Sequence, residues 1–162
     1  MIYELDGDVL RSGAQVIAHG VSPNDDFHQG LALQLREGMP EMYKDFRHHC
    51  KTMHPKPGGL MAWKLGEGRV LVHLFTQEPA YDHGSKPGRA TISHVNHALH
   101  ALRALIVKEQ ISSVALPKLA CGVGGLDWQD VQPLIAKQLG DLDIPVYVYV
   151  NYHKNEKAQE PK

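Results

Sequence analysis

The chain has 162 residues, of which 43% are hydrophobic and 22% charged, and its formal net charge is −1 at pH 7. This balance is typical of a single globular domain with a sizeable core, and it excludes a disordered chain. No apolar run approaches the ~20 residues of a membrane span, and the near-neutral charge lacks the basic excess typical of duplex-DNA binders, although a net value does not exclude a local patch.

The first half of the chain predicts two strands followed by two helices. "IYEL" (2–5) and "AQVIAHG" (14–20) have the composition of short strands. The N-terminus carries acids where a signal peptide carries bases, so we expect no secretion. "GLALQLREG" (30–38) predicts a short helix. The segment 40–53 predicts a longer one, because it starts with proline and places apolar residues at three- and four-residue steps.

The second half alternates strands with helices. The segments 59–65 and 69–77, joined by Gly66-Glu67-Gly68, predict a hairpin or adjacent strands. A helix over 91–108 with one apolar stripe, a buried strand over 112–120, a helix over 127–139 and a last strand over 144–150 follow. This alternation predicts an α/β layered fold with a largely parallel, covered sheet. We expect one domain over 1–152 and a polar, frayed tail over 153–162.

Two loops combine glycine with the start of a helix. The first is "HGVSPNDDFHQGLA" (19–32), and the second is "CGVGGLDW" (121–128), which follows an apolar run. A helix N-terminus offers free N–H groups and a favourable dipole to an anion. One such loop is explained by a tight turn alone, but two predict a diphosphate held from both sides. Neither loop fits the P-loop or the Rossmann pattern, and ordinary turns remain the alternative.

The segments "GLALQLREGMPEMYKDFRHHC" and "ALPKLACGVGGLDW" together resemble the macrodomain family, whose members bind ADP-ribose. The resemblance runs from "LDGDVL" (5–10) to Val150. It is strongest to the branch that contains the glycohydrolase acting on glutamate-linked ADP-ribose and the antitoxin that removes ADP-ribose from DNA. The resemblance implies a three-layer α/β/α macrodomain with a mixed, mostly parallel sheet of about six strands, and no cofactor.

The resemblance also implies which residues contact ADP-ribose. Asp8 falls where the family accepts a hydrogen bond from the adenine amino group, a task that suits a carboxylate; an Asp in a turn is the alternative. Tyr149 falls beside the adenosine, unless it is an ordinary strand aromatic. His19 is either a contact or a core histidine. The full set of expected ligand-binding residues is Asp8, Val9, His19, Gln29, Gly30, Leu31, Ala32, Pro117, Cys121, Gly122, Val123, Gly124, Gly125, Leu126 and Tyr149.

Two departures from the glutamate-specific relative bear on catalysis. Gln77 stands where that relative has a nucleophilic lysine, and Gly124 stands where it has an acid. An amide does not form a Schiff base, so a lysine mechanism is excluded. An attacking water, positioned near the distal ribose, is the remaining route. The candidate catalytic residues are Gln77, Ser22, His28 and Asp25. For the last two, a solvated loop histidine and a turn aspartate are the alternatives.

The predicted activity is removal of mono-ADP-ribose from acidic side chains of proteins. A reader module that binds ADP-ribose without turnover is the alternative. Hydrolysis of ADP-ribose from nucleic acid is a second, weaker alternative, because the chain lacks both the nucleophilic lysine at position 77 and an excess of basic residues. We expect a cytoplasmic monomer whose partners are ADP-ribose and mono-ADP-ribosylated proteins, with no membrane contact.

Cysteine and histidine patterns predict neither a disulfide nor a metal site. Cys50 and Cys121 form no C-x-x-C pair, which indicates a reduced protein. Cys121 is either a reactive thiol at a helix N-terminus or a small packing side chain. His94, His97 and His100 recur at three-residue steps, but no acid shares their face, so we expect no metal.

Overall fold

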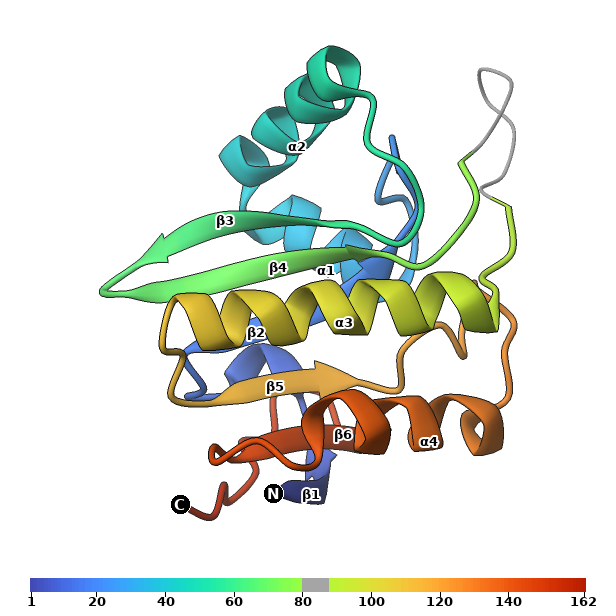
Figure 1. Cartoon of the computed structure of the whole chain (residues 1–162). Helices are drawn as coiled ribbons and strands as arrows, with labels where there is room; N and C mark the ends of the chain where they lie inside the picture. Colours follow the sequence, from blue (N-terminus) through green and yellow to red (C-terminus); the bar gives the residue numbers. More distant parts are fainter. Residues whose placement is uncertain (80–87) are drawn as a thin grey trace.

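The computed structural model describes residues 1–79 and 88–162 (Figure 1). Six strands form one sheet in the order β1-β6-β5-β2-β4-β3. The strands are β1 (Ile2–Gly7), β2 (Val16–Val21), β3 (Leu60–Gly66), β4 (Arg69–Phe75), β5 (Val114–Pro117) and β6 (Val146–Tyr152). All neighbouring pairs are parallel except β3 and β4, which form the antiparallel hairpin that the sequence predicts.

Helices cover both faces of this sheet. One face carries α3 (Ile92–Lys108) and α4 (Trp128–Leu139); the other carries α1 (Gly30–Gly38) and α2 (Pro40–Met53) (Figure 1). Alternate residues of β2 explain the two layers, because Val16 and Ala18 join the core under α3 and α4, whereas Ile17 and Val21 join the core under α1 and α2. This is the predicted three-layer fold. Within the described residues, no helix combines the length and the apolar character of a membrane span.

Helix boundaries match the prediction to within one residue, whereas every strand differs from its predicted range at one or both ends by up to three residues. α3 begins after Thr91, whose side chain accepts a hydrogen bond from the N–H of His94 (3.1 Å) and caps the helix. The strand predicted over 112–120 is shorter, because β5 ends at Pro117 and the chain then turns into the glycine loop. β6 starts two residues later than predicted and continues to Tyr152. A short 3-10 helix, η1 (Val9–Arg11), was not predicted.

The polar tail, predicted to fray, is instead packed against the domain. The carboxylate of Glu160 accepts hydrogen bonds from Ser12 Oγ (2.5 Å), from the N–H of Gly13 (3.0 Å) and from Tyr149 Oη (2.7 Å). Ala158 packs against the core that lies under α1 and α2. The tail therefore covers part of the β1 and β6 face that the helices leave open. Composition alone misses this, because the contacts of Glu160 with Ser12 and Gly13 join residues 148 and 147 positions apart.

Candidate active site

The loop between β2 and α1 is held by a single aspartate. Asp25 accepts hydrogen bonds from the N–H (3.1 Å) and the Oγ (3.0 Å) of Ser22 and from the N–H of Phe27 (2.8 Å). Phe27 is fully buried and packs on Phe46, with 4.7 Å between ring centroids. Phe27 also has a left-handed φ of 53°, which a bulky residue adopts only where packing compensates. The apolar anchor and the aspartate together fix where α1 begins.

The N-terminus of α1 presents main-chain donors. Gly30 has a φ of 64°, a left-handed conformation that favours glycine, and the N–H of Leu33 makes the first helical bond, to the carbonyl of Gln29 (3.3 Å). Among the described residues, no acceptor is recorded for the N–H groups of Gly30, Leu31 and Ala32. Free amides at a helix N-terminus favour an anion.

The glycines of the second loop have different physical causes. A Cβ on Gly124 would lie 2.7 Å from the carbonyl oxygen of Ala120 and 2.9 Å from Cβ of Ala90, so no side chain fits there. Gly125 has a φ of 78°. A Cβ on Gly122 would meet nothing within 4 Å. The acid that the glutamate-specific relative has at position 124 is therefore excluded by packing, whereas Gly122 leaves space open to a ligand.

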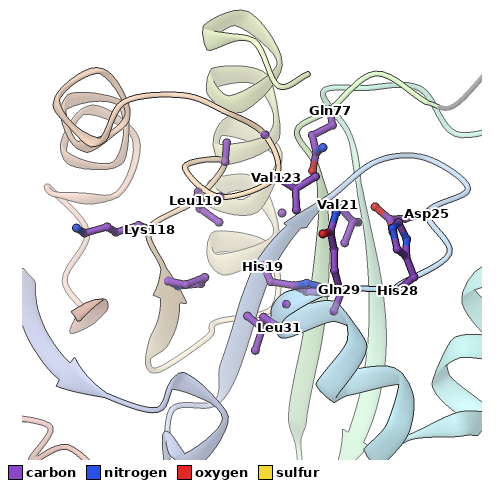
Figure 2. Close-up of a pocket in the computed structure, with 17 residues that line it drawn as sticks. His19, Val21, Asp25, His28, Gln29, Leu31, Gln77, Lys118, Leu119 and Val123 are labelled. Carbon is purple, nitrogen blue, oxygen red and sulfur yellow. The ribbon is translucent and has the colours of Figure 1, made fainter. Parts of the chain in front are cut away.

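The two loops face each other across one cavity of about 230 Å³ (Figure 2). The predicted residues that line it are Asp25, His28, Gln29, Gly30, Leu31, Ala32, Gln77, His19, Pro117, Gly122, Val123 and Gly124. The carboxyl ends of β2 and β5 lie at this edge, as expected for a ligand site in an α/β sheet. Two separate loops, 90 positions apart in the chain, thus meet as the sequence predicts.

Gln77 reaches into the cavity from the end of β4, with Asp25, His28 and Gln29 beside it (Figure 2). Its side chain is 4% exposed, and its Nε2 donates to the carbonyl of Gly88 (3.1 Å). Within the described chain, no donor is recorded for its Oε1. The amide is therefore oriented with its oxygen as the available polar atom. An oxygen acceptor can orient a water or a ribose hydroxyl, although it cannot attack as a nucleophile.

His28 and Ser22 occupy different environments. His28 is exposed, lines the cavity, and its Nδ1 is in hydrogen-bond contact with Oδ1 of Asp26. Ser22 is only 1% exposed, lies outside the cavity lining, and gives its hydroxyl to Asp25. The structure does not support the predicted role of Ser22 in orienting a water, because the hydroxyl is buried. Ser22 holds Asp25 in place instead.

His19, which the sequence left open as a ligand contact or a core histidine, lines the cavity and forms a buried pair with His73. Its Nε2 lies 2.7 Å from Nδ1 of His73, and both side chains are at most 2% exposed. Burial lowers the pKa of His19 to about 4, and burial with the nearby His19 lowers that of His73. Both rings are therefore neutral at pH 7. Nε2 of His73 has no partner in the described structure, which places an orphaned polar atom beneath the cavity.

The residues expected at the adenosine lie outside this cavity. Asp8 is 2% exposed; its Oδ1 accepts from the N–H of Leu10 (3.0 Å), and its Oδ2 accepts from the N–H of Asn155 in the tail (3.0 Å). Tyr149 is 5% exposed and donates to Glu160. Val9, Cys121, Gly125 and Leu126 are also absent from the cavity lining. The expected contacts of these residues with the ligand stay predictions.

Cys121 packs within its loop, and the described histidines gather into no cluster of metal ligands. Burial raises the pKa of the Cys121 thiol, and Sγ donates to the carbonyl of Leu119 (3.3 Å), so this cysteine packs rather than reacts. His94 lies 2.6 Å from Oε1 of Glu78. In the described part of the chain, no three side chains of His, Cys, Asp or Glu gather closely enough to hold a metal ion.

The sequence missed five residues that line the cavity: Gly20, Val21, Lys118, Leu119 and Ala120. All five lie at or just after the end of a strand, at the carboxyl edge of the sheet. That position in the sequence could have identified them as candidates. Lys118 is the one cation among them. Its side chain points away from Gln77 and His28 (Figure 2), and its Nζ lies 5.9 Å from the centre of the Trp128 ring. This lysine therefore does not replace the nucleophile that the sequence lacks at position 77.

Known proteins are similar to this chain in sequence and in fold. A DNA ADP-ribosyl glycohydrolase of Mycobacterium tuberculosis is 29% identical over 144 residues, which cover 87% of this chain and 40% of that protein. The human ADP-ribose glycohydrolase OARD1 is 24% identical over 136 residues, 82% of this chain and 80% of OARD1. The macrodomain of Thermus aquaticus DarG superposes with a TM-score of 0.81 at 24% identity, covering 93% of this chain and 98% of that one.

The bacterial glycohydrolases are longer proteins, and this chain spans 40% to 42% of their length. The Macro domain family model matches residues 18–135, which include both glycine loops, the cavity-lining end of β4 and α2. The family resemblance predicted from the sequence is confirmed, and so is the fold class. This chain belongs to the Macro domain family.

Proposed function

We propose that this chain binds ADP-ribose and hydrolyses the bond between C1″ of its distal ribose and a modified macromolecule. One observation carries the proposal: the two loops face each other across a cavity at the carboxyl edge of the sheet, and among the described residues no acceptor is recorded for the N–H groups of residues 30–32 or of residues 122–124. Amides that converge from two sides match a pyrophosphate. The names of the bacterial relatives and of OARD1, all ADP-ribose glycohydrolases, support the same ligand.

The cavity is too small to enclose the whole of ADP-ribose. About 230 Å³ is less than the ~300–1,000 Å³ of a pocket that encloses a whole drug-sized ligand. The diphosphate and the distal ribose fit the lined volume, with the diphosphate between α1 and residues 122–124. The adenosine then extends toward Asp8, outside the cavity. The distal ribose lies at the end formed by Gln77, Asp25 and His28.

Hydrolysis at this end proceeds by attack of a water. The water oxygen bonds to C1″, the bond from C1″ to the leaving group breaks, and a proton from the water passes to the leaving group or to solvent. Oε1 of Gln77 accepts a hydrogen bond from the water and so orients it. The diphosphate, negatively charged and next to the ribose, stabilises the positive charge that develops at C1″. This route needs no lysine at position 77.

The leaving group is the point on which two candidate substrates differ. The sequence led us to an acidic side chain of a mono-ADP-ribosylated protein, whose ester is intrinsically labile. A nucleic acid that carries ADP-ribose is the second candidate. The bacterial relatives, which are named DNA ADP-ribosyl glycohydrolases, favour it. In either case the chemistry at C1″ is the same.

Calorimetry with free ADP-ribose tests the binding part of the proposal. Gly122→Val adds a side chain where the fold has open space, so we expect a folded protein that binds ADP-ribose at least about tenfold more weakly, the equivalent of about 1.4 kcal/mol. Gly38→Val, at the end of α1 and equally open, is the matched control and should bind as the wild type does. Absence of heat from the wild-type protein at millimolar ADP-ribose would refute the proposal.

Release of ADP-ribose tests turnover. The wild-type protein is incubated with glutamate-modified peptide and with modified oligonucleotide, and free ADP-ribose is measured. We expect release from at least one substrate and slower release by Gln77→Ala, which removes Oε1. Tight binding of ADP-ribose without release from either substrate would identify the chain as a reader rather than a hydrolase.

A further inference from the structure

Positive charge is concentrated in one short segment of this slightly acidic chain. Residues 44–56 hold four lysine or arginine side chains against one aspartate, a net charge of +3, and three histidines as well. The rest of the chain has 13 such bases against 17 acids, a net charge of −4. A near-neutral total therefore hides a strongly basic region.

Helix geometry gathers these charges on one side of α2. Lys44, Arg47, His48 and Lys51 recur at steps of three, one and three residues, which places them on one face of the helix. The opposite side carries the buried residues Met42, Phe46 and Cys50. His54 continues the basic face past the helix end, where its left-handed φ of 49° turns the chain.

A cavity of about 580 Å³ opens beside this face. Arg47, His48, Lys51 and His54 line it, and none of its lining residues in the described part of the chain is acidic. Arg47 is anchored because its Nη1 donates to the carbonyl of Asn24 (2.7 Å), which leaves its other donors to the cavity. Within residues 1–79 and 88–162, neither Lys51 nor His54 forms an ion pair, and both are exposed. We call this the basic cavity.

The basic cavity lies next to the distal-ribose end of the candidate active site. The loop after β2 separates the two, because Asn24 lines the basic cavity while Asp25 lines the active site. The segment after β4 does the same, with Gln77 on one side and Pro79 on the other. Figure 1 shows the C-terminal end of α2 beside these two segments. A group attached to C1″ of a bound ADP-ribose leaves the active site at this end.

The chemistry of the basic cavity fits a phosphodiester strand. A nucleic acid carries one negative charge per nucleotide, and arginine and lysine side chains neutralise such phosphates. The rings of Pro23, Pro55 and Pro79 add apolar surface to the same cavity, against which a sugar or base can lie. Resting on the function proposed above, we infer that the basic cavity binds the phosphate backbone of a single-stranded nucleic acid that carries the ADP-ribose.

Charge reversal at Lys51 tests this inference with a matched control. Lys51 lies in the last turn of α2 and Lys137 in the last turn of α4, so Lys51→Glu and Lys137→Glu perturb equivalent helix positions. Lys137 lines neither cavity. Binding of a short, unmodified, labelled DNA strand is followed by fluorescence anisotropy over a range of salt concentrations. We expect Lys51→Glu to bind about five- to tenfold more weakly at low salt and to reduce the slope of log K against log salt by about 0.7. Lys137→Glu should match the wild type.

Three measurements distinguish failure of this inference from failure of the function proposed above. Free ADP-ribose should bind equally to the wild type and to Lys51→Glu in calorimetry, which shows that the active site is intact. If ADP-ribose binds but the unmodified strand does not bind, or binds equally to Lys51→Glu, the inference is wrong while the proposed function stands. If an oligoglutamate of equal length displaces the strand at lower concentration, the basic cavity serves an acidic protein instead and the inference is overturned.

Discussion

Acid should destabilise this fold through the buried histidine pair. His19 and His73 contact each other in a core that contains Phe27 and Phe46, and burial keeps both rings neutral. In the unfolded chain both rings take up a proton near pH 6.5. The folded pKa of His19 is depressed to about 4, so its contribution to stability is complete above pH 6.5 and is lost as the pH falls from 6.5 toward 4.

The size of the effect follows from the pKa difference. Between pH 7.5 and pH 5.5, the unfolded His19 gains about 0.8 of a proton and the folded His19 almost none, and integrating this difference over the interval lowers the free energy of unfolding by roughly 1.3 kcal/mol. The lowered pKa of His73 adds to this loss in the same direction. Urea unfolding at the two pH values, followed by tryptophan fluorescence, measures the change directly.

A double substitution isolates the pair from other titrating groups. His19→Leu with His73→Leu replaces two imidazoles by apolar side chains of similar volume and also removes the orphaned Nε2 of His73. We expect this variant to lose much less stability between pH 7.5 and 5.5 than the wild type. His100→Gln, at an exposed position on α3, is the control and should keep the wild-type loss. An equal acid-induced loss in the wild type and the double variant would refute the reasoning.

Three further changes probe the second glycine loop and the tail. Gly124→Asp should lower the free energy of unfolding by about 1–3 kcal/mol in urea melts, because its Cβ would overlap Ala120 and Ala90, whereas Gly122→Asp should not. Glu160→Gln should lower the pKa of Tyr149, which burial and the Glu160 carboxylate both raise, and an ultraviolet pH titration that showed no change would contradict the contact. A chain ending at Lys154 lacks the N–H that occupies Oδ2 of Asp8; we expect tighter ADP-ribose binding in calorimetry, and weaker or equal binding would count against competition by the tail.

The sequence predicted those features that local patterns encode. The start of α2 follows from Pro40, and the apolar stripe of α3 follows from a regular spacing that only a helix satisfies. The meeting of the two glycine loops was also predictable, because the carboxyl ends of parallel strands lie at one edge of a sheet. These inferences need no knowledge of which distant residues touch.

Contacts between distant segments could not be predicted in the same way. The His19 and His73 pair depends on the parallel register of β2 and β4, which places the two residues side by side. The packing of the tail depends on Glu160, one of two acids in a polar segment whose composition is that of any frayed terminus. In each case composition was uninformative because the partner lies elsewhere in the chain.

The two departures at positions 77 and 124 are physically linked. A lysine nucleophile at the end of β4 would need a nearby group to remove its proton, and packing against Ala90 and Ala120 excludes an acid at position 124. Among the described residues that line the cavity, Asp25 is the one carboxylate, and its oxygens already accept three hydrogen bonds. A lysine restored at position 77 alone would therefore stay protonated and inactive. On the proposed mechanism, hydrolysis depends on a water positioned by a neutral amide and on the charge of the substrate's own diphosphate, so its rate should fall in Gln77→Ala, which removes the oxygen acceptor.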